Sequence, residues 1–330
     1  MFLGIEIGGT KLQLGVGVGD GQIVDLVRCD VDAAKGAAGI LEQINSAAAE
    51  LGKKHRIERI GIGFGGPIDA ANGFTTKSHQ IAGWERFPLA RWCQEHMGRP
   101  ATLANDCDAA AVGEARFGAG VGTGSVFYAT VGTGIGGGLV IGGRLHGVGR
   151  PAAAEIGHLR PGLNANRPEI TVESLAAGPA IAAAARSRLA DAQNGKSDCR
   201  ADLLRRCGNN LDELTAKTVA AAAAEGNEIA RQVLAHACQA LGWAIAQVIT
   251  LVAPEIVVVG GGVSLIGEPF FFVPLRAEVA RYVFPPLADS YKIVPAALGE
   301  LAVVHGAIAL AADQTTGGAG PTAATRPGIQ

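Results

Sequence analysis

The sequence has little net charge and lacks the segments that mark membrane-bound, secreted or nucleic-acid-binding proteins. Its 330 residues carry a formal net charge of -2 without a basic block or stripe, so no surface for nucleic acid is expected. No uncharged apolar run reaches the ~18 residues of a membrane-spanning helix. No basic segment with a long apolar core begins the chain, so a secretory signal is not expected and the cytoplasm is the expected location.

Cysteine is scattered rather than paired. The six cysteines include no CxxC or CxC pair. In a long chain without a secretory signal, such residues are expected to be reduced thiols. Hydrophobic residues make up 48% of the chain and charged residues 18%, which is typical of a packed globular protein. The length suits two domains rather than one.

Glycine, by contrast, is abundant: 48 residues, against a usual share of about 7%. The strand predicted at 2–7 runs into the turn GGTK and a second strand at 12–18. The same order recurs where a strand at 124–131 is followed by GTGIGG and a strand at 138–142, and GGG follows the apolar run 255–259. These positions predict corners where the backbone approaches a ligand closely. Strands mixed with helices along the chain predict α/β layers.

The glycine segments at 61–66 and 132–137 match GxGxxG, the pattern of dinucleotide-binding loops. That fold needs a helix after the pattern, which neither context provides, so a nicotinamide enzyme is not favoured. No GxxxxGK[ST] run is present, which excludes a P-loop. Successive backbone N–H groups in a tight turn can bind phosphate without a helix, and Thr10, Lys11 and Thr133 would add donors. One such loop could serve chain reversal alone, but two together with GGG favour nucleotide binding.

A carboxylate stands at the junction between the strand predicted at 100–104 and the helix predicted at 107–117. Asp106 is preceded by Asn105 in the run LANDCDAAA. Aspartate at such a junction is commonly a helix N-cap. A carboxylate within reach of a substrate hydroxyl can also take its proton as a general base. The residues alone leave both roles open.

Three segments together resemble one family. EIGGTK at 6–11, VGTGIGGGLVIGGRLHGVGRPAAAEIGH at 131–158 and GGGV at 260–263 resemble the first phosphate loop, the signature and the adenosine-side loop of the ROK family of sugar kinases, within the actin and hexokinase superfamily. The resemblance extends from residue 3 to about residue 312. No winged-helix segment precedes Met1, so the kinase branch is expected rather than the repressor branch.

The resemblance implies roles for single residues. It makes Asp106 the catalytic base. It implies sugar contacts at Gly66, Asn105, Glu155, His158 and Glu173. It implies ATP contacts at Gly9, Thr10, Lys11, Thr133, Gly134, Gly261 and Gly262, with Mg²⁺ supported indirectly by Glu6.

Plainer explanations exist for three of the sugar contacts. Glu155 and His158 are three residues apart and could form one turn of a solvated helix. Glu173 could be an acid of a first helical turn, favoured there by the helix dipole. Their joint occurrence in the motif favours the sugar-binding role.

The implied fold is α/β: a two-domain, actin-like (ribonuclease H-like) ATPase fold with an interdomain cleft. We expect an N-terminal domain at 1–117, with a helix at 299–313 packing back onto it, and a larger domain at 118–298. The segment 314–330 lacks apolar periodicity and is expected to be a disordered tail. The two domains are expected to close on the sugar and exclude water.

The chain departs from the family at the zinc loop. The family commonly binds a structural zinc through the motif histidine and three cysteines, but 159–172 contains no cysteine. Because a closed zinc site needs four ligands, His158 alone cannot form one and we predict no zinc. Packing around Pro161 and Pro168 is expected to hold the loop instead.

Two smaller departures concern the substrates. Glu6 stands where the family usually has aspartate, and His79-Gln80 stands where a Pro-Asn pair is more common. The second change lies in a loop that the family places near the sugar, so substrate choice could differ.

The expected activity is ATP-dependent phosphorylation of a hexose, glucose first, on its primary hydroxyl, with Asp106 as general base. Fructose or an N-acetylhexosamine such as N-acetylmannosamine is the alternative within this class. A sugar-sensing regulator without catalysis is the alternative of another class. The expected partners are the sugar and ATP, with no nucleic acid and no membrane, and the family resemblance suggests a homodimer.

Overall fold

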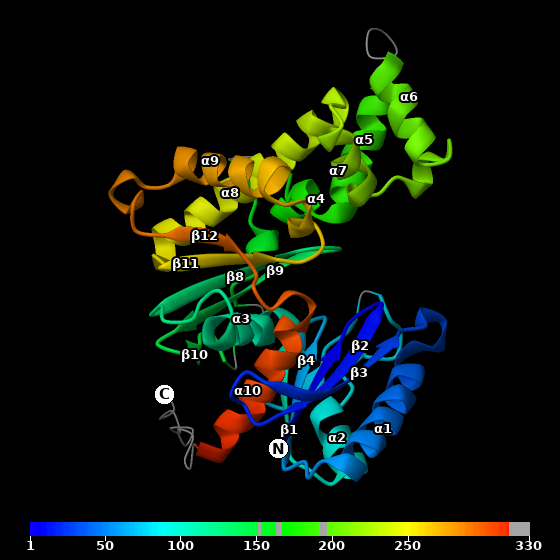
Figure 1. Cartoon of the computed structure of the whole chain (residues 1–330), viewed down its shortest axis with the longest axis vertical. Helices are drawn as coiled ribbons and strands as arrows, with labels where there is room; N and C mark the ends of the chain where they lie inside the picture. Colours follow the sequence, from blue (N-terminus) through cyan, green and yellow to red (C-terminus); the bar gives the residue numbers. More distant parts are fainter. Residues whose placement is uncertain (79, 149, 151–152, 163–166, 192–196, 317–330) are drawn as a thin grey trace, which may run out of the picture. The chain divides into compact units, whose positions relative to one another are not determined.

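The computed structural model describes residues 1–78, 80–148, 150, 153–162, 167–191 and 197–316. Contacts divide the chain into two compact units: unit 1 holds Met1–Ala109 and the chain from Val303, and unit 2 holds Ala110–Ala302. Each unit contains a five-stranded sheet with helices packed against it (Figure 1).

Unit 1 is built on a mixed sheet of order β3-β2-β1-β4-β7. Its strands are β1 Phe2–Ile7, β2 Lys11–Gly17, β3 Ile23–Asp30, β4 Arg59–Phe64 and β7 Ala101–Asn105. Its other elements are η1 Ala33–Lys35, α1 Gly36–Lys54, β5 Ile68–Asp69, β6 Phe74–Thr75, α2 Leu89–Met97 and α10 Ala302–Thr316. Because β1, β4 and β7 run parallel, their carboxyl ends meet at one edge of the sheet.

Glycines in the strands of unit 1 leave room for α10. A Cβ built on Gly61 would lie 1.8 Å from the carbonyl oxygen of Ala307, and one on Gly4 would lie 2.7 Å from that of Val304. The neighbouring residues Leu3 and Ile5 point to the other face, where they join one buried core with residues of α1 and α2. Gly61 of the first GxGxxG match therefore serves helix packing, not ligand approach.

Unit 2 repeats the mixed arrangement with a sheet of order β10-β9-β8-β11-β12. Its strands are β8 Ser125–Val131, β9 Ile135–Ile141, β10 Arg144–Leu145, β11 Ile256–Gly260 and β12 Lys292–Pro295. Its helices are η2 Ile156–His158, α4 Val172–Ala176, α5 Gly178–Asp191, α6 Ser197–Arg206, η3 Leu211–Glu213, α7 Ala216–Ala224, α8 Glu228–Val252, η4 Ser264–Ile266, η5 Glu268–Phe272, α9 Val273–Tyr282, η6 Pro285–Leu287 and η7 Gly299–Leu301. Helix α3, Asp106–Phe117, belongs to both units.

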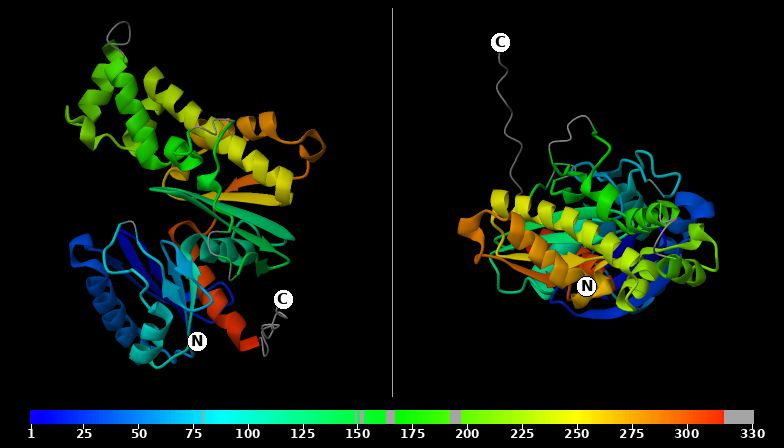
Figure 2. Two further views of the ribbon diagram at one scale, coloured as in Figure 1. Left: turned by 180° about the vertical axis from the view of Figure 1, so that it is seen from behind. Right: turned by 90° about the horizontal axis from the view of Figure 1, so that it is seen from above.

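Helix α8 is the central helix of unit 2. By length and composition, it is the one helix among the described residues that could cross a membrane. The sequence analysis did not expect such a helix. However, 67% of its apolar window is buried inside the protein, and its side chains join the main core cluster. Both views of Figure 2 show it lying along the helical layer of the unit. These features are typical of a core helix.

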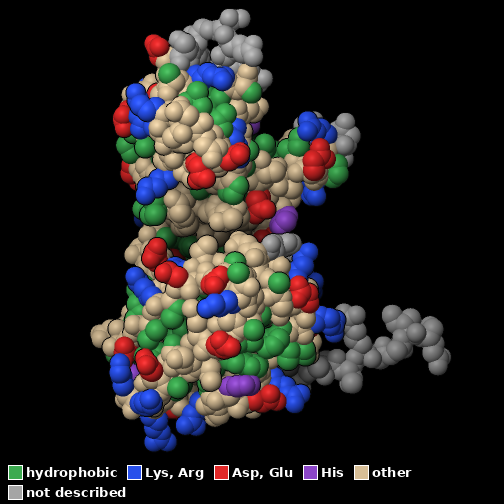
Figure 3. Space-filling model, turned by 90° about the vertical axis from the view of Figure 1, so that its right-hand side faces the viewer, with side chains coloured by type: hydrophobic (Ala, Val, Ile, Leu, Met, Phe, Trp, Pro, Cys, Tyr) green, Lys and Arg blue, Asp and Glu red, His purple; other side chains and the backbone are tan. Residues whose placement is uncertain are grey.

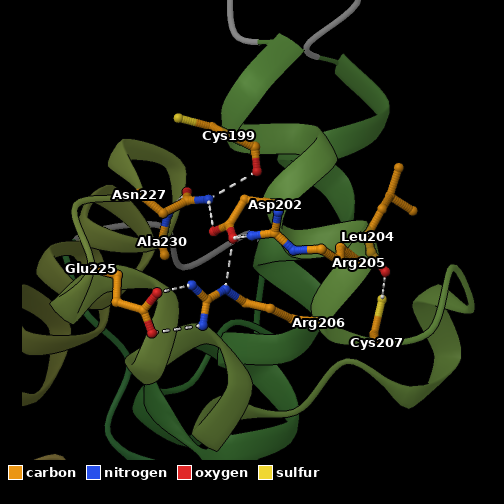
Figure 4. A network of polar contacts seen from close by, with 9 residues as sticks. All are labelled: Cys199, Asp202, Leu204, Arg205, Arg206, Cys207, Glu225, Asn227 and Ala230. Atoms are coloured by element: carbon orange, nitrogen blue, oxygen red, sulfur yellow. Dashed lines mark hydrogen bonds and ion pairs between the residues drawn. The ribbon is translucent and has the colours of Figure 1, made fainter.

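A polar network fastens α6 to the beginning of α8 (Figure 4). Asn227 caps α8 by accepting the N–H of Ala230 at 3.1 Å, and its Nδ2 donates to Asp202 Oδ2 at 2.9 Å. Arg206 Nε lies 2.9 Å from Asp202 Oδ1, and Arg206 Nη2 lies 2.6 Å from Glu225 Oε2. The hydrogen bonds from Arg206 hold the pKa of Glu225 below its usual value.

Two element boundaries differ from the sequence-based predictions. The turn predicted to cover all of GTGIGG ends at Gly134, because Ile135 already pairs with Val131 in the β8–β9 ladder. Helix α10 continues to Thr316, so the first residues of the predicted tail, 314–316, are helical. The rest of that tail lies outside the described residues.

Candidate active site

The carboxyl edge of the unit 1 sheet begins with the turn between β1 and β2. The N–H of Gly8 donates to the carbonyl oxygen of Lys11 at 2.9 Å, and Val31 donates to that of Thr10 at 3.0 Å. Within the described ranges, no recorded hydrogen bond uses the backbone N–H of Gly9 or Thr10. Adjacent unfilled donors in a tight turn fit a phosphate oxygen, as expected for the first phosphate loop.

Gln80 lies directly against this turn. A Cβ built on Gly9 would be 1.5 Å from Gln80 Oε1, so the end of that side chain lies directly over Gly9. The sequence singled out His79-Gln80 for its difference from the family. The structure brings Gln80 to the phosphate turn, whereas His79 lies outside the described residues.

Glu6 is buried beneath the turn, at the end of β1, with 9% of its surface exposed. Gln13 Nε2 donates to Glu6 Oε2 at 2.6 Å, and Lys11 Nζ lies 3.3 Å from Glu6 Oε1. Burial raises the pKa of Glu6, while Lys11 and Gln13 oppose that rise and Asp106 adds to it. Both oxygens already have protein partners, which fits indirect rather than direct support of a metal.

Asp106 begins α3 directly after β7. Its Oδ1 accepts the N–H of Cys107 at 2.9 Å, and Asn105 Oδ1 accepts the same N–H at 2.8 Å. A Cβ built on Gly65 would lie 3.4 Å from Asp106 Oδ2, so this second oxygen faces the turn after β4. Asp106 therefore caps α3 with one carboxylate oxygen while the other faces the turn after β4.

Burial sets the proton affinity of this carboxyl group. Asp106 is half-buried, and the removal of water raises its pKa above the ordinary value of 3.8, against the hydrogen bonds from Cys107. A carboxylate with a raised pKa is a better proton acceptor near neutral pH than an exposed one. The local chemistry therefore suits a general base.

Asn105 ties the ends of β4 and β7 together. Its Nδ2 donates to the carbonyl oxygen of Gly66 at 3.2 Å, while its Oδ1 accepts at the start of α3. Gly66 is confined, because a Cβ there would lie 3.0 Å from the carbonyl oxygen of Lys77. The structure thus brings Gly66, Asn105 and Asp106 together on one edge of unit 1.

Unit 2 presents its own glycine corner. The N–H of Gly132 donates to the carbonyl oxygen of Gly134 at 2.9 Å, closing the turn around exposed Thr133. Gly261 has φ +85°, and a Cβ on it would lie 2.6 Å from the carbonyl oxygen of Val131. Position 261 therefore requires glycine, because the backbone passes close to the end of β8. This passage brings residues 260–263 beside the turn at Thr133. As in unit 1, no recorded hydrogen bond in the described part uses the N–H of Thr133 or Gly134.

Glu173 is bound to the same corner. Its Oε2 accepts the N–H of Ile135 at 2.9 Å, and a Cβ on Gly134 would lie 2.8 Å from that oxygen. Thr171 caps the helix of Glu173 by accepting the N–H of Ser174. This carboxylate therefore orders the turn at Thr133, a role that the sequence did not indicate.

Glu155 and His158 flank the short helix η2. Glu155 is its N-cap residue, and its backbone carbonyl oxygen accepts the N–H of His158 at 3.1 Å. A Cβ on Gly157 would lie 2.0 Å from the carbonyl oxygen of Ile135, so η2 packs tightly on β9. Gly157 of this turn is buried, whereas Glu155 is half-buried and His158 is exposed.

The loop that lacks the zinc cysteines is closed by protein groups. Arg160 Nε donates to the carbonyl oxygen of Pro168 at 2.8 Å, and Val172 donates to that of Leu159 at 2.8 Å. Residues 163–166 lie outside the described chain. Among the residues that are described, no cluster of three or more His, Cys, Asp or Glu could hold a metal ion.

Two contributors escaped sequence reasoning. Gln13 is 0% exposed and positions Glu6; a glutamine within the apolar run LQLGVGV was the signal available. Gln80 was noted only as a departure from the family, and nothing in the sequence indicated its position over Gly9.

Comparisons with known proteins agree with this geometry. The ROK family matches residues 2–314. A glucokinase from Thermotoga maritima is 30% identical over 316 residues, covering 96% of this chain and 98% of that protein. An N-acetylmannosamine kinase from Escherichia coli is 29% identical over 313 residues, covering 93% and 99%. A ROK family glucokinase from Streptomyces griseus, solved in complex with glucose and AMPPNP, is 31% identical with a TM-score of 0.79, covering 94% and 99%. The predicted α/β, actin-like ATPase fold is confirmed.

Proposed function

The chain belongs to the ROK family and is a sugar kinase, and on that premise we propose that it phosphorylates glucose on its primary hydroxyl with ATP. The observation that supports this most is the position of Asp106. Its second carboxylate oxygen faces the turn after β4 at the sheet edge that also bears the Gly9 turn, and burial raises its pKa. A proton acceptor beside a phosphate turn suits transfer to an alcohol.

In the proposed reaction the hydroxyl oxygen bonds to the γ-phosphorus of ATP while the bond from that phosphorus to the β–γ bridging oxygen breaks. Asp106 Oδ2 takes the hydroxyl proton. Lys11 and the N–H groups of Gly9 and Thr10 stabilise the charge of the transferring group. Mg²⁺ bound with ATP would neutralise phosphate charge, and Glu6 would support the bound ion indirectly.

The remaining assignments belong to the same proposal. We assign the nucleotide to Lys11 and the turns named above, with Thr133, Gly134, Gly261 and Gly262 on the unit 2 side. We assign the sugar hydroxyls to Gly66, Asn105, Glu155, His158 and Glu173. Asn105 and Glu173 would then hold substrate while also ordering the backbone beside it. A cytoplasmic homodimer without zinc completes the proposal, and metal analysis of the purified protein should find no stoichiometric zinc.

A second substrate class is N-acetylmannosamine, favoured by the likeness to the Escherichia coli kinase. The change to His79-Gln80 is compatible with it, because these residues stand in the loop that the family places near the sugar. Fructose remains the third sugar. A regulator without catalysis is disfavoured, because a sugar binder has no use for the desolvated carboxylate of Asp106.

A coupled ADP-release assay across glucose, fructose, mannose and N-acetylmannosamine tests the proposal. We expect the highest kcat/KM with glucose, and a fall of roughly a thousandfold or more in kcat for Asp106→Asn with sugar binding retained. Asp20→Asn removes one carboxylate from an exposed turn and should change neither constant. If Asp106→Asn turned over as fast as the unaltered protein, the role of Asp106 as base would be refuted. Preference for another sugar would refute only the choice of glucose as substrate.

A further inference from the structure

Unit 1 contains a cavity at the end of its sheet opposite the candidate active site. The cavity measures about 530 Å³ and is lined by residues of β1, β4, α1 and α2. Leu3 and Ile60, each 1% exposed, are among its apolar lining residues. Its volume lies within the ~300–1,000 Å³ of typical small-molecule sites.

The polar lining of this cavity is cationic. Its described lining residues include no aspartate or glutamate, and its basic members are Lys53, Lys54, His55, Arg56, His96 and Arg99. On the face that Figure 3 draws, Lys, Arg and His side chains lie along the lower edge, with some Asp and Glu side chains among them. Such a lining, without an acid, attracts anions.

Nearby acids neutralise only part of this charge. Asp25, outside the lining, lies 3.2 Å from Lys54 Nζ and 3.0 Å from His55 Nε2. These contacts hold the pKa of Asp25 below its usual value, so it stays a carboxylate. Over the described ranges, the side chains of Lys53, Arg56 and Arg99 take part in no recorded ion pair or hydrogen bond. Three cations around the cavity therefore remain uncompensated.

Helix ends explain some of these residues but not all. Lys53 and Lys54 lie in the last turn of α1, where cations stabilise the helix dipole. His96 lies in the last turn of α2 and its Nδ1 lies 2.9 Å from the carbonyl oxygen of Trp92. Arg56 and Arg99 stand beyond both helices, so helix stabilisation gives no reason for them.

The cavity is separate from the phosphate turn. Leu3 is near the start of β1 and Gly8 follows its end, so the two sites are about 17 Å apart at ~3.3 Å per residue. A small ligand at this end of the sheet therefore cannot contact the groups around Asp106.

We propose that this cavity is a binding site for a small ligand that carries a phosphate group. Arg56 and Arg99 bind the phosphate oxygens, Lys53 adds charge, and the partly exposed apolar side chains of Ile57 and Met97 contact the rest of the ligand. Guanidinium groups suit this task because they donate two parallel hydrogen bonds to phosphate. The proposal does not depend on the reaction proposed above.

Histidine-selective ¹³C labelling of the full chain gives a local readout, because His55 and His96 line the cavity. Their signals, assigned by His55→Gln and His96→Gln, are followed during titration with glucose 6-phosphate and, separately, inorganic phosphate. We expect saturable shifts of these two signals, and at least a tenfold weaker affinity in Arg56→Gln/Arg99→Gln. The charge-matched control, Lys217→Gln/Lys292→Gln, alters two exposed lysines of unit 2 and should bind as the unaltered protein does.

The outcomes separate clearly. Shifts with glucose 6-phosphate alone support the site and identify an organic phosphate, whereas equal shifts with both probes support a site for the phosphate group itself. Absence of saturable shifts at His55 and His96, or equal weakening in both double variants, overturns the proposal. Loss of kinase activity has no bearing on this readout.

Discussion

Asp106 caps a helix and, in the proposed function, also acts as the general base. Its Oδ1 caps α3, while its Oδ2 faces the turn at Gly65. Burial next to Glu6 raises the pKa of both carboxyl groups, and the Asp106 charge adds to the rise at Glu6. The folded protein therefore holds two carboxyl groups whose protonated forms are favoured, a feature that is common at functional sites.

The first prediction follows from the direction of that shift. Because the folded pKa of Asp106 exceeds 3.8, the folded state binds its proton more tightly than the unfolded state, and stability falls as pH rises through the raised pKa. Asp106→Asn should thus be more stable than the unaltered protein at pH 7, with the difference vanishing below pH 3.8. Urea denaturation at several pH values measures it.

The same shift predicts the activity profile. As a base, Asp106 must be deprotonated, so kcat/KM should fall toward acid pH with a midpoint above 3.8. A midpoint at or below that value, or an Asn variant less stable at pH 7, would contradict the raised pKa.

The second prediction concerns Glu114, which is 0% exposed in α3. Its carboxylate accepts backbone N–H groups from Ala119 at 2.8 Å, Ala297 at 3.1 Å and Leu298 at 2.8 Å. Glu114→Ala leaves these donors without their acceptor and should lower the free energy of unfolding by roughly 3 kcal/mol. Glu114→Gln keeps one accepting oxygen and should lose less. Equal stability of the Ala variant and the unaltered protein in urea would refute the role.

At the scale of elements, helix ends and turns fix the connections. The network in Figure 4 joins α6 to α8 through Asn227, which is 5% exposed and also donates to the carbonyl oxygen of Cys199 at 2.8 Å. An N-cap that simultaneously bonds a neighbouring helix sets both where its own helix begins and where the neighbour packs.

The third prediction tests this connection. Asn227→Ala removes the cap of α8 and both bonds to α6, so unfolding should become easier by about 2 kcal/mol. Chemical denaturation followed by circular dichroism measures the change. His236→Ala, an exposed position on the same helix, should leave stability nearly unchanged. A loss no larger at Asn227 than at His236 would mean that the network contributes nothing.

At the scale of the whole molecule, substrate binding should be visible as stabilisation. The fourth prediction is that glucose at one hundred times its Kd raises the free energy of unfolding by about 2.7 kcal/mol, since it binds the folded state alone. Differential scanning calorimetry measures the rise in Tm. Asp106→Asn should show a similar rise, because the base takes a proton rather than holding the sugar. An unchanged Tm with glucose but a raised Tm with N-acetylmannosamine would reassign the substrate.

The sequence alone was enough to predict the α/β class, the two strand–turn–strand hairpins and the position of Asp106 between β7 and α3. These features depend on local rules: apolar runs form buried strands, and glycine clusters turn the chain. The family, too, followed from three contiguous segments. Each such signal lies within a few residues of the feature it predicts.

Only the tertiary structure decided which residues meet across the chain. Gly61 matched a nucleotide pattern yet faces Ala307 of α10, some 250 residues away in the sequence. Gln13 became the partner of Glu6, and Gln80 came to lie over Gly9. The cationic cavity joins the contiguous run 53–56 to His96 and Arg99, which follow about 40 residues later in the sequence. Burial and side-chain contact are properties of packing, so local composition and spacing carry no record of them.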